Sequence, residues 1–256
     1  FARYAKTEQY DGTSWSEVGD LNTARNSLAG WGTQTAMVVA GGYTPSVTGA
    51  TESWDGTSWA NEPGSLATAR ATFAGGGSSS SEGIISGGFT STANLNSSER
   101  FNKSINTVVA AAWASGGALP TATGSLAAAG TQTAGLGFGG YAPSITNSTL
   151  KYDGSSWTAV NNMGTARASL GGCGIQTAAL AFGGITPPQT GKTEEYDGTN
   201  WSEQTDMTTA RDRLGAAGIQ TAALGFGGNT GSASPPYPAA TEEYNGSSWT
   251  NGGSLS

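Results

Sequence analysis

The chain has 256 residues, of which 41 are glycine and only 11% are charged, and its formal net charge at pH 7 is -7. A pI near 4.5 argues against a phosphate-backbone or anionic-membrane footprint, so we expect neither nucleic acid nor membrane insertion among its partners. The chain has no histidine and one cysteine, Cys173, which removes the commonest metal ligand, the commonest general base and any internal disulfide.

The sequence predicts neither a membrane span nor a signal peptide. No apolar run approaches the roughly 18 residues that span a bilayer, and Phe1–Lys6 lacks the layout of a signal peptide. Because the chain does not begin with methionine, we expect it to be a processed product or an internal portion of a longer protein.

Self-similarity organises the whole chain, and its clearest copy is TEEYDGTNWSEQTDMTTARDRLGAAGIQTAALGFGG at 193–228. Two independent markers keep the same period. The paired glycines lie 44 to 52 residues apart, at 41–42, 87–88, 139–140, 183–184 and 227–228. The landmark tryptophans lie 44 to 54 residues apart, at Trp15, Trp59, Trp113, Trp157, Trp201 and Trp249.

Each repeat predicts four short antiparallel strands, which we name a, b, c and d in chain order. The small-residue segment RLGAAG predicts strand a and the apolar segment TAALGFGG predicts strand b. After a polar loop, TEEY and NWS predict strands c and d, because the Asp-Gly between them is a strong hairpin signal. A period of 40 to 50 residues with four strands is typical of a β-propeller blade.

In chain order, 1–24 holds a c–d hairpin, and complete blades follow at 25–61, 70–115, 123–159, 167–204 and 211–251. We therefore predict an all-β protein with a single β-propeller domain over 1–256, made of five complete blades plus the N-terminal hairpin.

The two ends of the chain suggest how the ring closes. The sequence at 253–256 matches that at 64–67, which leads into Thr-Ala-Arg and the next strand a. We expect a sixth, closing blade that combines the N-terminal c–d hairpin with an a–b hairpin following Ser256. Exchange between identical copies could not supply these strands, because every copy has the same surplus and the same lack.

One unit is irregular. Twelve positions separate Phe101 from Trp113 where the other units have five, and Thr123 replaces the expected arginine. We predict a longer c-to-d excursion there, with a tolerated insertion favoured over a contact surface.

The recurring order of Arg, strand, apolar strand ending in Gly-Gly, loop, Tyr-Asp-Gly and Trp resembles the kelch repeat of galactose-oxidase-type propellers, over essentially the whole chain. This resemblance implies a kelch-like propeller with strand a nearest the central channel. A copper site built on histidines does not carry over, since the chain has none. The sequence motif YDGTSW followed by TAR also resembles repeats of bacteriophage and other viral structural proteins.

The repeated polar and aromatic residues have two interpretations each. The tryptophans could stack on sugars, but packing between blades is the favoured role. The arginines could ring the channel mouth and hold an anion, but we favour ties from each blade to carbonyls or carboxylates of its neighbour. They are Arg25, Arg70, Arg167 and Arg211.

No residue set predicts catalysis. The carboxylates that could form a glycosidase pair recur with the blades, whereas a catalytic pair is needed once. These are Asp153, Glu194, Glu195, Asp197, Glu242 and Glu243. Cys173 takes the place of Trp31 and Ala129 in the other strands a, so we predict a packing residue. We expect no enzyme activity, no cofactor and no metal.

The loops between strands b and c differ most between units, and strand alternation puts them all on one face. We predict a recognition face with solvent-accessible side chains. Its candidate ligand-binding residues are Tyr43, Phe89, Tyr141, Asn229 and Tyr237.

These features predict a non-enzymatic virion or surface protein, located on the virion surface or outside the cell. A phage appendage, tail fibre or capsid-attached propeller is the leading interpretation, with other virion or surface subunits and host glycans as partners. The alternatives are a secreted component of an extracellular matrix or filament and, with less support, a carbohydrate-active enzyme.

Overall fold

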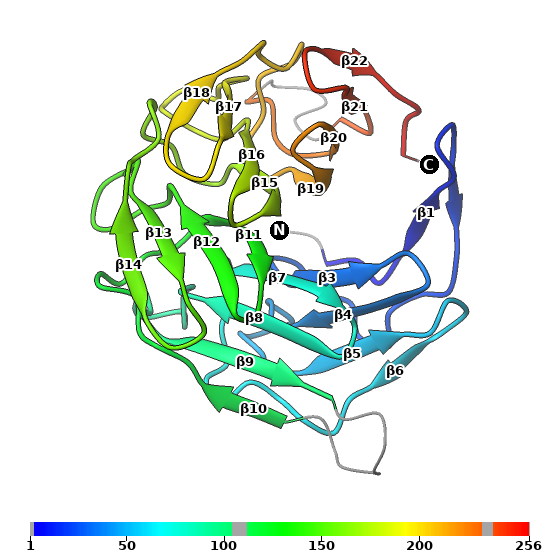
Figure 1. Ribbon diagram of the computed structural model, residues 1–256. Helices are drawn as coiled ribbons and strands as arrows, with labels where there is room; N and C mark the ends of the chain where they lie inside the picture. The colour runs from blue at the N-terminus through cyan, green and yellow to red at the C-terminus, as the bar shows by residue number, and fades with distance from the viewer. Residues whose placement is uncertain (1–2, 104–111, 232–237, 256) are drawn as a thin grey trace.

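The computed structural model describes residues 3–103, 112–231 and 238–255, and every regular element within these ranges is a β-strand. The strands form five four-stranded antiparallel sheets and one two-stranded sheet. The sheets are arranged in a ring, which is a β-propeller (Figure 1). The predicted fold class, five complete blades plus an N-terminal hairpin, is confirmed.

In every blade the strands pair in chain order, so the letters a to d apply to each sheet from its first strand to its last. The N-terminal hairpin is β1 (Glu8–Tyr10) and β2 (Trp15–Glu17). Blade 1 is β3 (Ala29–Thr33), β4 (Ala36–Ala40), β5 (Thr51–Trp54) and β6 (Trp59–Asn61). Blade 2 is β7 (Ala74–Ser79), β8 (Glu82–Ser86), β9 (Ser98–Asn102) and β10 (Ala112–Ser115). Blade 3 is β11 (Ala127–Thr131), β12 (Ala134–Phe138), β13 (Thr149–Tyr152) and β14 (Trp157–Val160). Blade 4 is β15 (Gly171–Ile175), β16 (Ala178–Phe182), β17 (Thr193–Tyr196) and β18 (Trp201–Glu203). Blade 5 is β19 (Gly215–Ile219), β20 (Ala222–Phe226), β21 (Thr241–Tyr244) and β22 (Trp249–Asn251).

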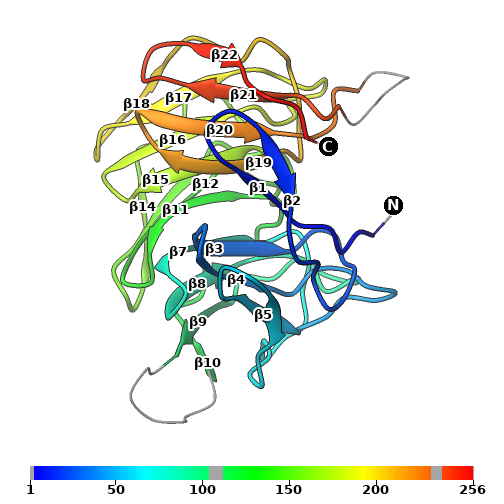
Figure 2. The same ribbon diagram turned by 90° about the vertical axis from the view of Figure 1, so that its right-hand side faces the viewer.

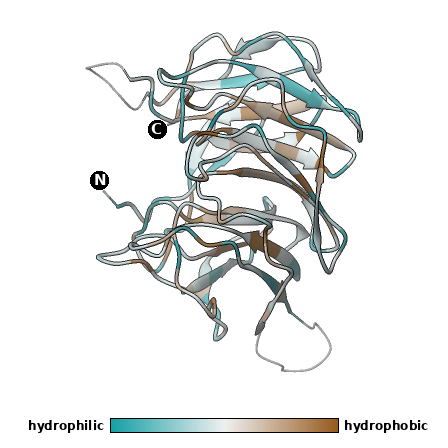
Figure 3. Cartoon of the chain, turned by 90° about the vertical axis from the view of Figure 1, so that its left-hand side faces the viewer, coloured by the Kyte–Doolittle hydropathy of each residue, from teal (hydrophilic) through white to brown (hydrophobic). Residues whose placement is uncertain are grey.

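Strand a of each blade lies at the centre of the ring, where neighbouring blades come closest. A Cβ added at Gly75 in β7 would lie 2.8 Å from the Cβ of Ala29 in β3. One added at Gly172 in β15 would lie 2.6 Å from the ring of Phe138 in β12. Packing between blades therefore requires a small residue at these two positions of strand a. Figure 3 shows hydrophobic residues on the inner strands and hydrophilic ones toward the rim.

The predicted Asp-Gly hairpins connect strands c and d. In blade 1, Oδ1 of Asp55 accepts hydrogen bonds from the backbone N–H groups of Thr57 and Ser58, both at 2.8 Å. Gly56 follows with φ near +94°, a conformation that favours glycine. In blade 5, Asn245 takes the place of the aspartate and accepts the same pair of bonds at 3.0 Å.

The landmark tryptophans connect successive blades. In the five complete blades, the indole Nε1 donates to a hydroxyl in the first residue of strand c of the preceding unit, or in the residue before that strand. The pairs are Trp59–Thr7 at 3.0 Å, Trp113–Thr51 at 3.4 Å, Trp157–Ser98 at 3.0 Å, Trp201–Thr149 at 3.0 Å and Trp249–Thr193 at 2.9 Å. Trp59, Trp157 and Trp249 are buried, and the other three are half-buried. The five indoles that donate this bond therefore both fill space and connect neighbouring units, whereas no hydrogen bond is made by Nε1 of Trp15 within the described residues.

A second series of bonds runs around the channel through main-chain atoms alone. The backbone N–H of Thr72 donates to Ser27 O, and the same step from blade to blade is made by Ser125, Ser169 and Arg213, at 2.8 to 3.2 Å. All five residues have φ between +50° and +55°. Their left-handed backbone turns the chain into strand a.

The N-terminal hairpin lies in the ring between blade 5 and blade 1 (Figure 1). In Figure 2, where the ring is seen edge-on, the hairpin lies between β19 of blade 5 and β3 of blade 1. Within the described residues, no helix is long and apolar enough to cross a membrane. The predicted excursion between Phe101 and Trp113 falls largely at 104–111, outside the described residues.

Candidate functional site

The site is built on the residue that follows the Gly-Gly pair in each blade. In blade 1 the backbone of Tyr43 exchanges two hydrogen bonds with Asn26, at 2.8 and 3.1 Å. Positive φ values at Gly41 and Gly42 turn the chain out of strand b and bring Tyr43 onto one face of the ring. The same bridge places Phe89, Tyr141, Ile185 and Asn229 in blades 2 to 5.

Four of the five predicted recognition residues are thus equivalent positions on one face, which we call the loop face: Tyr43, Phe89, Tyr141 and Asn229. Phe89 and Tyr141 expose 38% and 48% of their surface, whereas Tyr43 and Asn229 are half-buried. Tyr237 lies outside the described residues. Ile185 belongs to the same set and was not predicted, although its position after Gly-Gly was a usable signal.

A pocket of about 420 Å³ opens on the loop face between blades 1 and 2. We call it the loop-face pocket. Tyr43 and Phe89 form its aromatic walls, Thr72 and Ser91 bring hydroxyl groups, and Arg3 closes one side. The guanidinium of Arg3 lies 5.3 Å from the ring centroid of Tyr43, a cation–π contact that orients both side chains. This volume is within the range of small-ligand sites.

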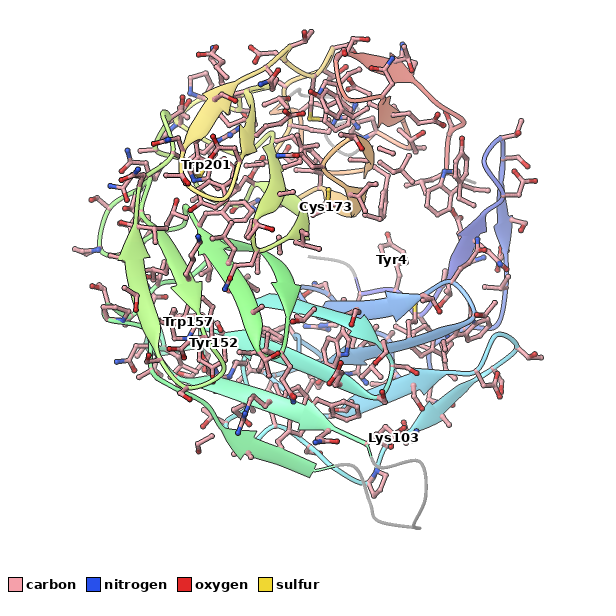
Figure 4. The ribbon with its side chains drawn as sticks, in the orientation of Figure 1. Tyr4, Lys103, Tyr152, Trp157, Cys173 and Trp201 are labelled. Atoms are coloured by element: carbon pink, nitrogen blue, oxygen red, sulfur yellow. The ribbon has the colours of Figure 1, made fainter. Side chains whose placement is uncertain are left out.

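Arg3 was missed by sequence analysis because it lies outside the repeat. Neighbouring Tyr4 exposes 69% of its surface, and Figure 4 shows it beside the opening near the centre of the ring. The N-terminal segment therefore adds a cation and an aromatic ring to the face that carries the repeated aromatic positions.

The four repeated arginines do not belong to this surface. Arg70, which is fully buried, donates to the carbonyls of Thr68, Gly87 and Ser97 and to the carboxylate of Glu99 at 2.6 Å. Arg25, Arg167 and Arg211 likewise donate through Nη1 to two carbonyls and pair through Nη2 with Glu52, Glu194 and Glu242. All these partners lie in the blade of the arginine itself. The expectation that these side chains tie one blade to the next is therefore wrong.

The ion pairs are buried in their blades. In blade 4, burial lowers the pKa of Arg167 to about 10, against the raising influence of Glu194. The carboxylates also accept backbone N–H groups, as Glu242 does from Thr208 and Thr209 at 2.6 and 3.2 Å. Each pair thus fastens the loop that enters strand a to strand c of the same blade.

Blade 3 replaces both members of the pair. Thr123 stands where the others have arginine, and Leu150 in β13 stands where they have glutamate. The two changes together remove a buried ion pair without leaving either charge alone, which is how such a pair is lost at little cost.

The remaining carboxylates and the thiol are engaged in the scaffold. Glu195 accepts from the Tyr244 hydroxyl at 3.1 Å, and Asp153 and Asp197 cap hairpin turns. Cys173 is buried beside the channel (Figure 4), and burial raises the pKa of its thiol to about 12. Across 3–103, 112–231 and 238–255, no group of three or more acidic or cysteine side chains is placed to hold a metal ion.

No known protein family and no curated protein matches the chain. The geometry of the repeats and of the loop face is therefore the basis for a functional assignment.

Proposed function

We propose that the protein is a non-enzymatic adhesion or structural component of a virion or cell surface, and that its loop face binds glycans through the loop-face pocket. On this proposal the blades are of the kelch type, and the propeller is an appendage, tail-fibre or capsid-attached domain. The observation that carries it is the pocket between Tyr43 and Phe89.

The chemistry of the pocket suits a pyranose ring. The apolar face of a sugar packs on aromatic rings, and its hydroxyl groups exchange hydrogen bonds with Thr72 and Ser91. Arg3 supplies rigid paired donors, which favours a sugar that carries a carboxylate.

Binding without turnover agrees with how the reactive side chains are used. Glu194 and Glu242 are held in buried ion pairs, and the Cys173 thiol is protonated at neutral pH because burial raises its pKa to about 12. A scaffold whose titratable groups serve stability leaves its variable loops for recognition.

The test uses an array of immobilised neutral and uronic-acid oligosaccharides, followed by calorimetric titration with the strongest binder. Phe89→Ala should lower affinity by about 10- to 100-fold, as expected for an aromatic anchor. Ile185→Ala is the matched control, because it changes the equivalent position of blade 4 outside the pocket.

Two results would contradict the proposal. One is an array on which no oligosaccharide binds. The other is an affinity that Phe89→Ala leaves unchanged, or that Ile185→Ala lowers as much as Phe89→Ala does. Tyr141→Ala locates the ligand further, because Tyr141 lies on the loop face but outside the pocket.

A further inference from the structure

The N-terminal hairpin borders a cavity that continues the central channel. The cavity has a volume of about 690 Å³ and is lined by Tyr10 and Trp15 of the hairpin, by Gly30 and Met37 of blade 1, and by Leu224 and Phe226 of blade 5. We call the part between β1, β3 and β20 the slot. It lies where strands a and b lie in the five complete blades.

The hairpin is docked as the c–d half of a blade. Its Trp15 ring lies 5.3 Å from Phe226, as Trp249 lies 4.8 Å from Phe182 one blade earlier. The hydroxyl of Tyr10 donates to Glu243, as that of Tyr244 does to Glu195. The slot is therefore the inner half of a sixth blade, bounded on three sides by surfaces with known counterparts.

Main-chain groups beside the slot match an a–b strand pair. In four blades the N–H of the second glycine donates to a carbonyl at the entrance to the next strand a, from Gly42 to Arg70, Gly88 to Thr123, Gly140 to Arg167 and Gly184 to Arg211, at 2.8 to 3.3 Å. Gly228 is the fifth such glycine, and no described residue takes the acceptor's place.

The first glycine of the pair shows the same fit. A Cβ at Gly139 or Gly183 would lie 2.6 or 2.7 Å from the carbonyl oxygen of the next blade's arginine. At Gly227 the nearest atom is Cδ1 of Leu255, at 3.8 Å. The backbone of blade 5 is thus shaped for a carbonyl that would enter the slot.

Leu255 lies where the chain enters a blade. Its N–H donates to Ala239 O at 2.8 Å, as Leu66 does to Gly49 O, Met163 to Asn147 O and Met207 to Gly191 O. In each of those three cases an arginine stands four residues later, at 70, 167 and 211. A strand pair entering the slot from the Leu255 side would therefore keep the register of the repeat.

Glu8 defines the chemistry of the occupant. Thr7-Glu8-Gln9-Tyr10 aligns with Thr241-Glu242-Glu243-Tyr244, so Glu8 in β1 holds the position of the buried glutamates in strand c. In all five complete blades the two positions agree: four have arginine with glutamate, and blade 3 has Thr123 with Leu150. A glutamate at this position of the hairpin therefore predicts an arginine at the entrance to the strand a that pairs with it.

We propose that the slot is the seat of one strand pair of the repeat's own a–b type, entering from the Leu255 side, whose arginine pairs with Glu8. Bound there, the pair would supply the carbonyl that faces Gly228 and would cover Phe226 and Trp15. It would also complete the ring between blade 5 and blade 1. This inference is independent of the glycan-binding proposal.

The test adds a synthetic peptide with the sequence of Thr209–Gly228, TARDRLGAAGIQTAALGFGG, to the protein. At about 100 times its dissociation constant, the peptide should raise the melting temperature by about 5 to 10 °C. It should also slow hydrogen exchange at the Gly228 amide and the Trp15 indole. The matched control peptide has threonine in place of the arginine that corresponds to Arg211, and should bind at least about tenfold more weakly.

A second variant keeps the test decisive if the free peptide is insoluble. The same twenty residues fused after Ser256 stand in the register of 165–184, and should give the same stabilisation and protection. Glu8→Leu should abolish the preference for arginine over threonine. An unchanged melting temperature and unchanged Gly228 exchange in the fused protein would overturn the proposal. Equal stabilisation by both peptides on the parent chain would overturn the pairing with Glu8.

Discussion

Blades 4 and 5 have nearly the same sequence but different surroundings. Both read TAR, then an a strand, IQTAAL, FGG and TEEY. In blade 4, which lies between two complete blades, Phe182 and its neighbours in β16 are fully buried. Blade 5 is followed in the ring by the two-stranded N-terminal hairpin, and its Phe226 and Leu224 are half-buried. Burial of a repeat unit is therefore decided by its neighbours as much as by its own residues.

The comparison also separates two kinds of interaction. Contacts inside a blade, such as the ion pairs of Arg167 and Arg211, are alike in blades 4 and 5. Contacts between blades, such as those of Phe182 and Phe226, differ. Substitutions at equivalent positions can therefore measure each kind separately.

The largest effect is expected from the ion pairs. Arg167→Leu and Arg211→Leu should each lower the free energy of unfolding by about 3 to 5 kcal/mol, because each leaves a buried glutamate without its partner. The two losses should be similar, since all contacts of these guanidinium groups lie in their own blades. Urea unfolding at neutral pH measures them.

Blade 3 supplies the control for that experiment. Adding Glu194→Leu to Arg167→Leu reproduces the apolar state of Leu150 and should recover most of the lost stability. A much smaller loss for Arg211→Leu than for Arg167→Leu would show that the ion pair depends on the neighbouring blade, and the distinction would fail.

An intermediate effect should separate the two phenylalanines. Phe182→Ala should cost about 3 to 5 kcal/mol of unfolding free energy, because it empties a closed site against Trp249. Phe226→Ala should cost about 1 to 3 kcal/mol, since part of its surface is already in contact with solvent. The same urea titrations measure the gap, and equal losses would mean that the slot is closed in solution.

The smallest effect concerns the hairpin turns. The N–H groups of Asn200 and Thr199 lower the pKa of Asp197 from 3.8, because they bind its ionised form. This stabilisation is present above the unfolded-state pKa and is lost as the pH falls through the folded-state pKa. Blade 5 has Asn245 in the same turn, which does not titrate. Asp197→Asn should therefore reduce the loss of stability between neutral pH and about pH 3. Urea unfolding at both pH values checks it, and an unchanged difference would contradict it.

The repeat made much of the fold predictable. Gly-Gly requires a backbone conformation that few other residues adopt, so it locates the end of strand b in all five blades. Asp-Gly locates the turn between strands c and d in the N-terminal hairpin and in blades 1, 3 and 4. Small residues in strand a and apolar residues in strand b then identify the inner strands. The five blades and the hairpin follow from counting these units.

The contacts between repeats were less predictable. A glutamate about 30 residues after each arginine could belong to the same blade or face another one, because the period alone does not give the direction of a side chain. Arg3 belongs to no repeat, so nothing in the pattern indicated that it lies beside Tyr43. The loop-face pocket could therefore not be predicted from the sequence, although the face that carries it was predicted.

The main-chain bonds around the channel have a consequence for how such a protein can change. The links from Thr72 to Ser27 and from Arg213 to Ser169 use backbone atoms only, and they accept serine, threonine or arginine at the same left-handed position. A duplicated or recombined blade would find these links in its new place whatever side chains it brings. The loops of the loop face can thus diversify by exchange of whole units, while the main-chain hydrogen bonds around the channel stay the same.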